Sequence, residues 1–224
     1  MRNKISGKSV STLAGIISII VLPLMTFSSS AQTKQQGLSW QRILKALFPP
    51  NRPQRPISRP TQQASLCFIA PNNQTIYSTR PLLLWKGNLK KVAVTNLGRD
   101  DYFWSDDKIN AQKNFVIYGG QELKPGQSYE WHGFIGENPA ILASFQVMDA
   151  QRRSFVDNEL KALETQLKAN RVSKETIALE RANYFVKKEL WSDVLQEAYS
   201  VPNPSGELLQ ILQKLPDDLC KGAS

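Results

Sequence analysis

Residues 82–95, LLLWKGNLKKVAVT, decide the fold class of this chain. Two short runs of apolar and β-branched residues, Leu82–Lys86 and Lys91–Thr95, flank a Gly87-Asn88 turn, which is typical of β-strands. Similar runs recur at intervals of roughly eight to twelve residues. The predicted strands are Leu66–Ile69, Leu82–Lys86, Lys91–Thr95, Tyr102–Trp104, Phe115–Tyr118, Ser128–Phe134 and Ala143–Val147. Seven short strands predict an antiparallel β-sandwich over residues 66–148.

After Asp149 the apolar residues recur with a period near 3.6, which predicts helices. Asp149 and Asn170 bound the first helix, and its apolar face consists of Val156, Leu160, Leu163 and Leu167. Three further helices are expected to begin at the N-cap residues Ser173, Ser192 and Ser205. The fold class is therefore mainly β plus α, with a helical domain over residues 149–224 behind the sandwich.

The N-terminal residues predict a signal peptide over residues 1–31. A basic start at residues 2–8 precedes an uncharged run at residues 9–33, and Ser29-Ser30-Ala31 supplies the small side chains that a signal peptidase recognises. We expect cleavage after Ala31 and export to the periplasm or the cell exterior. The alternative is a retained membrane anchor, since about twenty apolar residues can span a bilayer.

Residues 32–65 predict a basic, proline-rich tether with one short amphipathic helix. Its apolar face consists of Trp40, Ile43, Leu44, Leu47 and Phe48. The functional interpretation is that these side chains contact a membrane, with residues 34–59 binding an anionic membrane or cell-wall surface. The alternative is that the helix packs on its own domain. Nucleic acid is not an expected partner, because the chain is exported.

Charge is unevenly distributed along the chain. No Asp or Glu precedes Asp100, whereas 14 of the 28 Lys and Arg residues do. The basic excess is therefore local, and it lies in the tether and the first strands.

Cys67 and Cys220 are the two cysteines of the chain, and both lie in the part predicted to be exported. An oxidising compartment lets such thiols pair, so a disulfide is predicted. It would join the first strand to the end of the chain and contribute about 5 kcal/mol in the chain-entropy model. The alternative is two unrelated buried thiols.

Residues 123–129, LKPGQSY, resemble the corner that precedes a late strand in fibronectin type III and other Ig-like domains. In those domains the tyrosine hydroxyl bonds to the backbone of the corner, so the resemblance implies that role for Tyr129. Trp85 stands at a place similar to that of their core tryptophan. The resemblance implies an Ig-like fold and little about activity.

Two further resemblances concern the helical part and the whole chain. Residues 182–201 resemble one tetratricopeptide hairpin, which we expect to dock on the sandwich because a single repeat is not stable alone. The signal, the stretch Cys67–Pro71, the corner before Tyr129-Glu130-Trp131 and the helical tail together resemble a family of uncharacterised cyanobacterial exported proteins. That resemblance implies a secreted or surface-associated setting and no mechanism.

Two groups of polar residues could carry chemistry. Glu130 and His132 share one face of a strand, and such a pair could bind a metal ion or act as acid and base in a hydrolase. A surface contact is the preferred interpretation, because further ligands are missing from the pattern. The second group is an oxygen-rich loop, where a solvated loop is preferred over a calcium site: Asp100, Asp101, Asp106, Asp107 and Asn110.

The sequence thus predicts no enzyme, no cofactor and no metal ion. We expect an exported, non-enzymatic binding or assembly module with an unknown protein or cell-envelope partner, because its fold commonly presents loops for recognition. The alternatives are a membrane-surface accessory protein, held by an uncleaved signal or by the Trp40–Phe48 helix, and a metal-dependent hydrolase.

Overall fold

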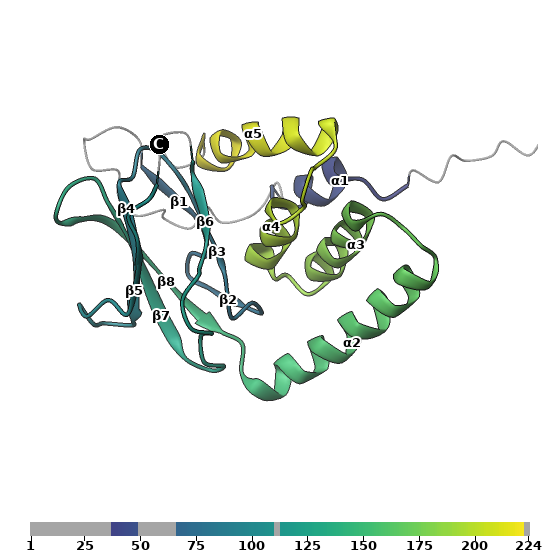
Figure 1. Ribbon diagram of the computed structural model, residues 1–224, viewed down its shortest axis with the longest axis horizontal. Coiled ribbons are helices and arrows are strands. Elements are labelled where there is room, and N and C mark those ends of the chain that lie inside the picture. The colour runs from purple at the N-terminus through teal and green to yellow at the C-terminus, as the bar shows by residue number, and fades with distance from the viewer. Residues whose placement is uncertain (1–36, 49–65, 110–112, 222–224) are drawn as a thin grey trace, which may run out of the picture. The chain divides into compact units, whose positions relative to one another are not determined.

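The computed structural model describes residues 37–48, 66–109 and 113–221 of the chain. These residues form eight strands and five helices (Figure 1). The strands are β1 (Cys67–Ala70), β2 (Gln74–Ile76), β3 (Leu82–Lys86), β4 (Lys91–Asn96), β5 (Trp104–Asp106), β6 (Phe115–Ile117), β7 (Ser128–Phe134) and β8 (Pro139–Val147). The helices are α1 (Trp40–Lys45), α2 (Ala150–Ala169), α3 (Lys174–Lys187), α4 (Trp191–Tyr199) and α5 (Gly206–Cys220). The predicted signal peptide and most of the tether lie outside the described residues.

The strands form two sheets. One has three strands in the order β1-β3-β6, and the other has five in the order β2-β8-β7-β4-β5. The predicted bounds of β3 and β7 are confirmed, whereas β2 was missed. The prediction of a purely antiparallel arrangement is wrong at one pairing, because β2 runs parallel to β8. The fold is therefore a mixed α/β arrangement of two sheets and several helices.

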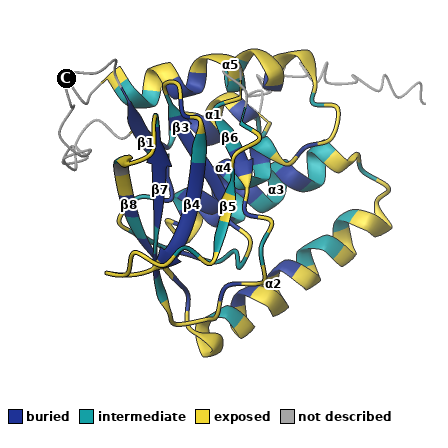
Figure 2. Ribbon diagram, turned by 60° about the vertical axis from the view of Figure 1, so that its left-hand side comes forward, coloured by how far each residue is buried: buried dark blue, intermediate teal, exposed yellow. Residues whose placement is uncertain are grey.

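Strand β3 is buried on both faces and separates two hydrophobic cores. Leu83 and Trp85 point toward the five-stranded sheet, in what we call the sheet core. Leu82 and Leu84 point toward the helices, in the helical core. A continuous apolar run is what a strand covered on both faces requires. Figure 2 shows β3 buried between the helices and the second sheet, so the described elements stack as helices, three-stranded sheet and five-stranded sheet.

Aromatic rings fill the middle of the sheet core. Trp131 stacks on Phe68 with 3.7 Å between ring centroids, and its Nε1 donates a hydrogen bond of 2.8 Å to the carbonyl of Pro71. Gly133 leaves room for this arrangement, because a Cβ atom there would lie 2.9 Å from Phe68 and 2.7 Å from Leu89. The two sheets are thus held together by close contacts between residues far apart in sequence.

The helix caps follow the predictions with one exception. Asp149, Ser173 and Ser205 each accept a backbone hydrogen bond from the residue three positions later. The prediction for Ser192 is wrong, because the N-cap of α4 is Leu190 and Ser192 is buried inside the first turn. Helix α4 therefore begins two residues earlier than the serine suggests.

Helix α5 contains Pro216, which cannot donate the hydrogen bond to Leu212 that an α-helix needs. The hydroxyl of Tyr199 donates to that Leu212 carbonyl at 3.3 Å. A side chain of α4 therefore satisfies the backbone group that the proline leaves free, and α5 continues to Cys220.

The predicted disulfide between Cys67 and Cys220 is present and joins β1 to the end of α5. Asp217 lies one turn before Cys220 on the same helix. It forms an ion pair of 2.9 Å with Lys86 on β3. The C-terminal helix is thus held to the three-stranded sheet by a covalent bond and a charge pair.

Helix α1 belongs to the helical core, although it precedes the first strand in sequence. It packs against α3 and α5. Nε1 of Trp40 donates a hydrogen bond of 3.1 Å to Glu175 on α3, and the same carboxylate accepts two bonds from Ser205, the N-cap residue of α5. One carboxylate therefore holds three helices together, and this part of the predicted tether is folded.

Candidate functional site

The pair formed by Glu130 and His132 lies on the outer face of the five-stranded sheet. Nε2 of His132 is 3.4 Å from Oε2 of Glu130, and its Nδ1 is 2.8 Å from the hydroxyl of Tyr102. The Tyr102 ring also contacts Phe134 edge-on. The loop before β5 thus covers the histidine, and both ring nitrogens have partners.

Little of either side chain is open to solvent. The side chain of His132 is 5% exposed and that of Glu130 is 17% exposed. Burial is the largest cause that raises the pKa of Tyr102, and Asp100 and Glu130 add to it. A protonated Tyr102 hydroxyl beside His132 suits a structural hydrogen bond that holds the loop on the sheet.

The aspartates of the oxygen-rich loop do not come together. Asp101 pairs with Arg99 at 2.9 Å, and Asp106 accepts the backbone N–H of Lys108 at 2.9 Å. Asn110 lies outside the described residues. Nowhere in residues 37–48, 66–109 and 113–221 do three His, Cys, Asp or Glu side chains gather as they would around a metal ion.

The side chains predicted to contact a membrane are mostly inside the helical core. Trp40, Ile43, Leu44 and Leu47 are buried, and Phe48 is 41% exposed. A membrane contact through this face would require α1 to leave α3 and α5. Within the described ranges, no helix is both long enough and apolar enough to cross a bilayer.

A polar joint fixes α4 to the chain between β2 and β3. The carboxylate of Asp193 accepts the backbone N–H groups of Tyr77 and Ser78, each at 2.9 Å. Gln196, one turn later, accepts the N–H of Leu82 at 3.1 Å. The two side chains satisfy a stretch of backbone that the helix covers, so they position the helical core on the three-stranded sheet.

The surroundings of Asp193 also shift its protonation. Burial raises the pKa of Asp193 to about 7, although the N–H groups of Tyr77 and Ser78 act in the opposite direction. A strongly shifted pKa can mark a functional site. Here the carboxylate is buried and bonded to backbone, so its role is structural.

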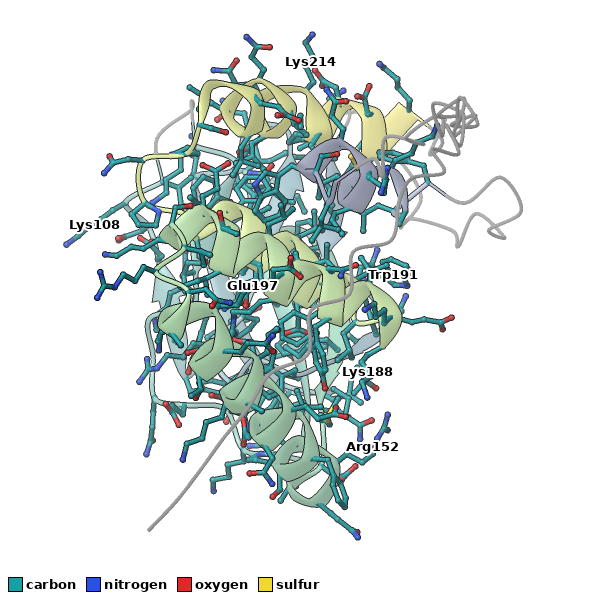
Figure 3. The ribbon with its side chains drawn as sticks, turned by 90° about the vertical axis from the view of Figure 1, so that its right-hand side faces the viewer. Lys108, Arg152, Lys188, Trp191, Glu197 and Lys214 are labelled. Atoms are coloured by element: carbon teal, nitrogen blue, oxygen red, sulfur yellow. A yellow bond between two sulfur atoms is a disulfide. The ribbon has the colours of Figure 1, made fainter. Side chains whose placement is uncertain are left out.

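A partly buried charge network joins α2, α3 and α4. Arg181 on α3 lies 2.5 Å from Glu164 on α2 and 2.7 Å from Glu197 on α4. Burial raises the pKa of Glu197, and the charge of Arg181 counteracts it. Figure 3 shows Glu197 among the helices. The network links the three helices through the charge of Arg181.

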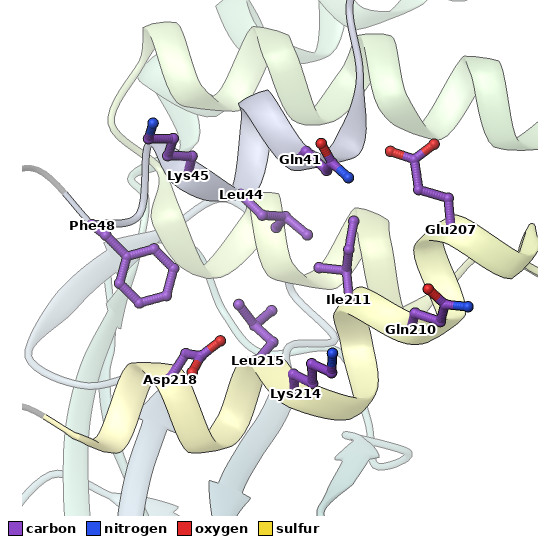
Figure 4. A pocket seen from close by; sticks show the side chains of 10 residues that line it. All are labelled: Gln41, Leu44, Lys45, Phe48, Glu207, Gln210, Ile211, Lys214, Leu215 and Asp218. Carbon is purple, nitrogen blue, oxygen red and sulfur yellow. The ribbon is translucent and has the colours of Figure 1, made fainter.

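A groove lies between α1 and α5, with a volume of about 380 Å³. Its floor is apolar and includes Leu44, Ile211 and Leu215, with Phe48 at one end. Figure 4 shows the polar side chains along its rim: Gln41, Lys45, Glu207, Gln210, Lys214 and Asp218. Apolar floors with a few polar groups at the edge are typical of binding sites.

The groove was not predicted, although its apolar residues belong to two segments whose helical periodicity was recognised. Leu44 and Phe48 come from the amphipathic segment, and Ile211 and Leu215 come from a helix about 170 residues later in the chain. The periodicity of each segment indicates an apolar face without naming the partner of that face. No local signal joins the two helices.

Comparisons with protein-family models, with curated proteins and with solved structures give no significant match to this chain.

Proposed function

We propose that this protein is an exported, non-enzymatic binding module and that the groove between α1 and α5 holds a segment of a partner protein. The observation that carries the proposal is the groove itself, whose apolar floor includes the partly buried Ile211 and whose end is formed by Phe48, which is 41% exposed. Apolar surface that is left in contact with water favours association with a partner. A groove between two helices with a floor of this kind suits a helix or an extended segment.

The rigidity of the walls supports a binding function. Glu175 ties Trp40 on α1 to Ser205 at the start of α5, and the disulfide fixes the other end of α5. A partner therefore meets a groove whose two walls are already in place, which lowers the entropy cost of binding.

The disulfide also supports the exported setting, since such bonds persist in oxidising compartments. The expectation that the two sheets form an Ig-like unit belongs to the same proposal. It is supported by the hydroxyl of Tyr129, which accepts the N–H of Lys124 at 2.9 Å as in a tyrosine corner, and by the buried Trp85. The parallel pairing of β2 with β8 departs from an all-antiparallel arrangement.

Site-specific photo-crosslinking in the native host tests the binding function. A photo-reactive residue at Gln210, which lines the groove, is expected to form a crosslink to one partner segment. The matched control is Gln213 on the same helix, which is exposed and does not line the groove. Equal products from both positions, or none from Gln210, would overturn the proposal.

The exported setting has its own test in the intact mass of the unreduced protein from fractionated cells. In the exported fraction we expect the mass of a chain that begins at Gln32 and that lacks the two thiol protons because its cysteines are paired. A mass that still includes Met1, in the membrane fraction, would overturn cleavage and favour the retained anchor.

A further inference from the structure

We infer that the segment held by the groove is amphipathic and acidic, with its carboxylates placed against Lys45 and Lys214. The inference rests on the proposed function, because it names the chemistry of the partner of the same groove. Lys45 lies on the α1 wall and Lys214 on the α5 wall (Figure 4). The apolar floor lies between them.

The charges of the rim are not equally available to a partner. Asp218 forms an ion pair of 2.6 Å with Lys221, and Glu207 lies in the first turn of α5, where the helix dipole favours an acidic side chain. Lys45 and Lys214 are exposed, and neither forms an ion pair within the described part of the chain. Among the described residues, the rim therefore carries two lysines without an ion pair against one such carboxylate, Glu207, so its unpaired charge is positive overall.

The position of these lysines beside the apolar floor affects which partner charge the groove prefers. A carboxylate bound above an apolar floor meets less solvent screening than one on open surface, so a lysine beside it discriminates between acidic and basic partners. A basic segment would bring like charges together at both walls. Charge complementarity thus selects an acidic segment over a basic one.

The dimensions of the groove favour a short segment. Glu207 and Asp218 mark its two ends on α5 and stand eleven positions apart, which is about 16 Å along a helix. A partner helix of about eleven residues or an extended stretch of about five would span that length. The polar side chains spaced along the rim suit the hydrogen-bonding groups of a polypeptide, which an acyl chain lacks.

Selection from a displayed library of random peptides of about twelve residues tests the inference. The bait is the oxidised protein, and the blocked variant is Gln210→Trp, which places a large ring in the groove. The matched control is Gln213→Trp on the same helix. Peptides that bind the wild type and the control but not the blocked variant are the groove-dependent ones.

The expected groove-dependent peptides carry apolar residues together with Glu or Asp. The double variant Lys45→Glu/Lys214→Glu should weaken their binding by roughly tenfold or more and should select Lys-rich and Arg-rich peptides instead. Both lysines are exposed, so the double variant should keep the melting temperature of the wild type.

Three outcomes separate the inference from the proposed function. Acidic groove-dependent peptides whose charge preference inverts in the double variant support both. Groove-dependent peptides that are neutral or basic, or that bind the double variant equally well, overturn the acidic partner and leave the groove function in place. A selection in which no peptide distinguishes Gln210→Trp from Gln213→Trp overturns the proposed function.

Discussion

The sheet core and the helical core share β3 but are assembled in different ways. The sheet core draws its residues from one continuous part of the chain, from Leu66 to Val147. The helical core combines residues 150–220 with α1, which lies before all the strands, and with Leu82 and Leu84 of β3. The sheet core therefore needs contacts only within one continuous stretch of chain. The helical core needs contacts between segments that are far apart in sequence.

This difference has a consequence for function. The groove lies between α1 and α5, the two helices of the helical core that are most distant in sequence. Surfaces made by distant segments depend on every interaction that holds those segments in place. We therefore expect changes in the helical core to affect stability and binding together, and changes in the sheet core to affect stability alone.

Loss of the disulfide should have the largest effect, because this bond joins the two cores. Reduction, or the double variant Cys67→Ser/Cys220→Ser, should lower the free energy of unfolding by up to about 5 kcal/mol. Urea unfolding with and without a reductant measures it. The double variant serves as the control, since a reductant should leave it unchanged. Equal stability of the oxidised and reduced wild type would contradict the coupling.

Removal of the Trp40 side chain distinguishes a folded α1 from a loosely attached one. Trp40→Ala should lower the free energy of unfolding by about 3 kcal/mol, because a buried ring and a bond to Glu175 are lost. Trp131→Ala, in the sheet core, is the comparison and should cost a similar amount. A change at Trp131 with none at Trp40 would show that α1 unfolds separately from the cores.

The pH dependence of stability should reveal the contact of Asp193 on α4 with the backbone before β3. The pKa of Asp193 is raised by burial to about 7, above its value in the unfolded chain. The folded state therefore binds a proton more tightly, and this group lowers stability as the pH rises from about 4 to 7, by about 1.4 kcal/mol per pH unit at most.

Asp193→Asn should remove that slope. Urea unfolding at several pH values measures the slope for both proteins. As the pH falls from 7 to 4, the free energy of unfolding of the wild type should rise relative to that of the variant. Parallel curves for the two proteins across this range would contradict the raised pKa.

The smallest expected effect is the loss of one tyrosine hydrogen bond in each core. Tyr129→Phe removes the acceptor for the N–H of Lys124 in the sheet core, and Tyr199→Phe leaves the Leu212 carbonyl without a donor in the helical core. Each should cost about 1 kcal/mol. Tyr184→Phe is the control, because its partner Glu159 is exposed and water can replace the bond. Thermal unfolding measures all three, and a control effect as large as the others would contradict the argument.

Local patterns were enough to predict most elements. The bounds of β3 and β7, the caps Asp149, Ser173 and Ser205 and the pairing of the two cysteines depend on residues close in sequence or on there being one possible partner. Strand β2 was missed because three residues carry too little periodicity. The prediction of Ser192 as a cap was wrong because a serine beside the start of a helix is not always its N-cap.

The candidate sites were harder to predict than the fold. The sequence placed Glu130 and His132 on one face of a strand, but the cover that Tyr102 supplies comes from a loop whose direction the sequence does not encode locally. The groove needed the packing of α1 against α5, which periodicity could not assign to a partner.

The sequence by itself determined the apolar faces, the turns, the helix caps and the basic character of the N-terminal part, because each of these depends on neighbouring residues. Only the tertiary structure decided that α1 completes the helical core, that β3 is covered on both faces and that Leu44 meets Ile211 and Leu215 in an open groove. The physical reason is that burial is not directional: an apolar face must be covered, and shape complementarity across the whole chain selects what covers it.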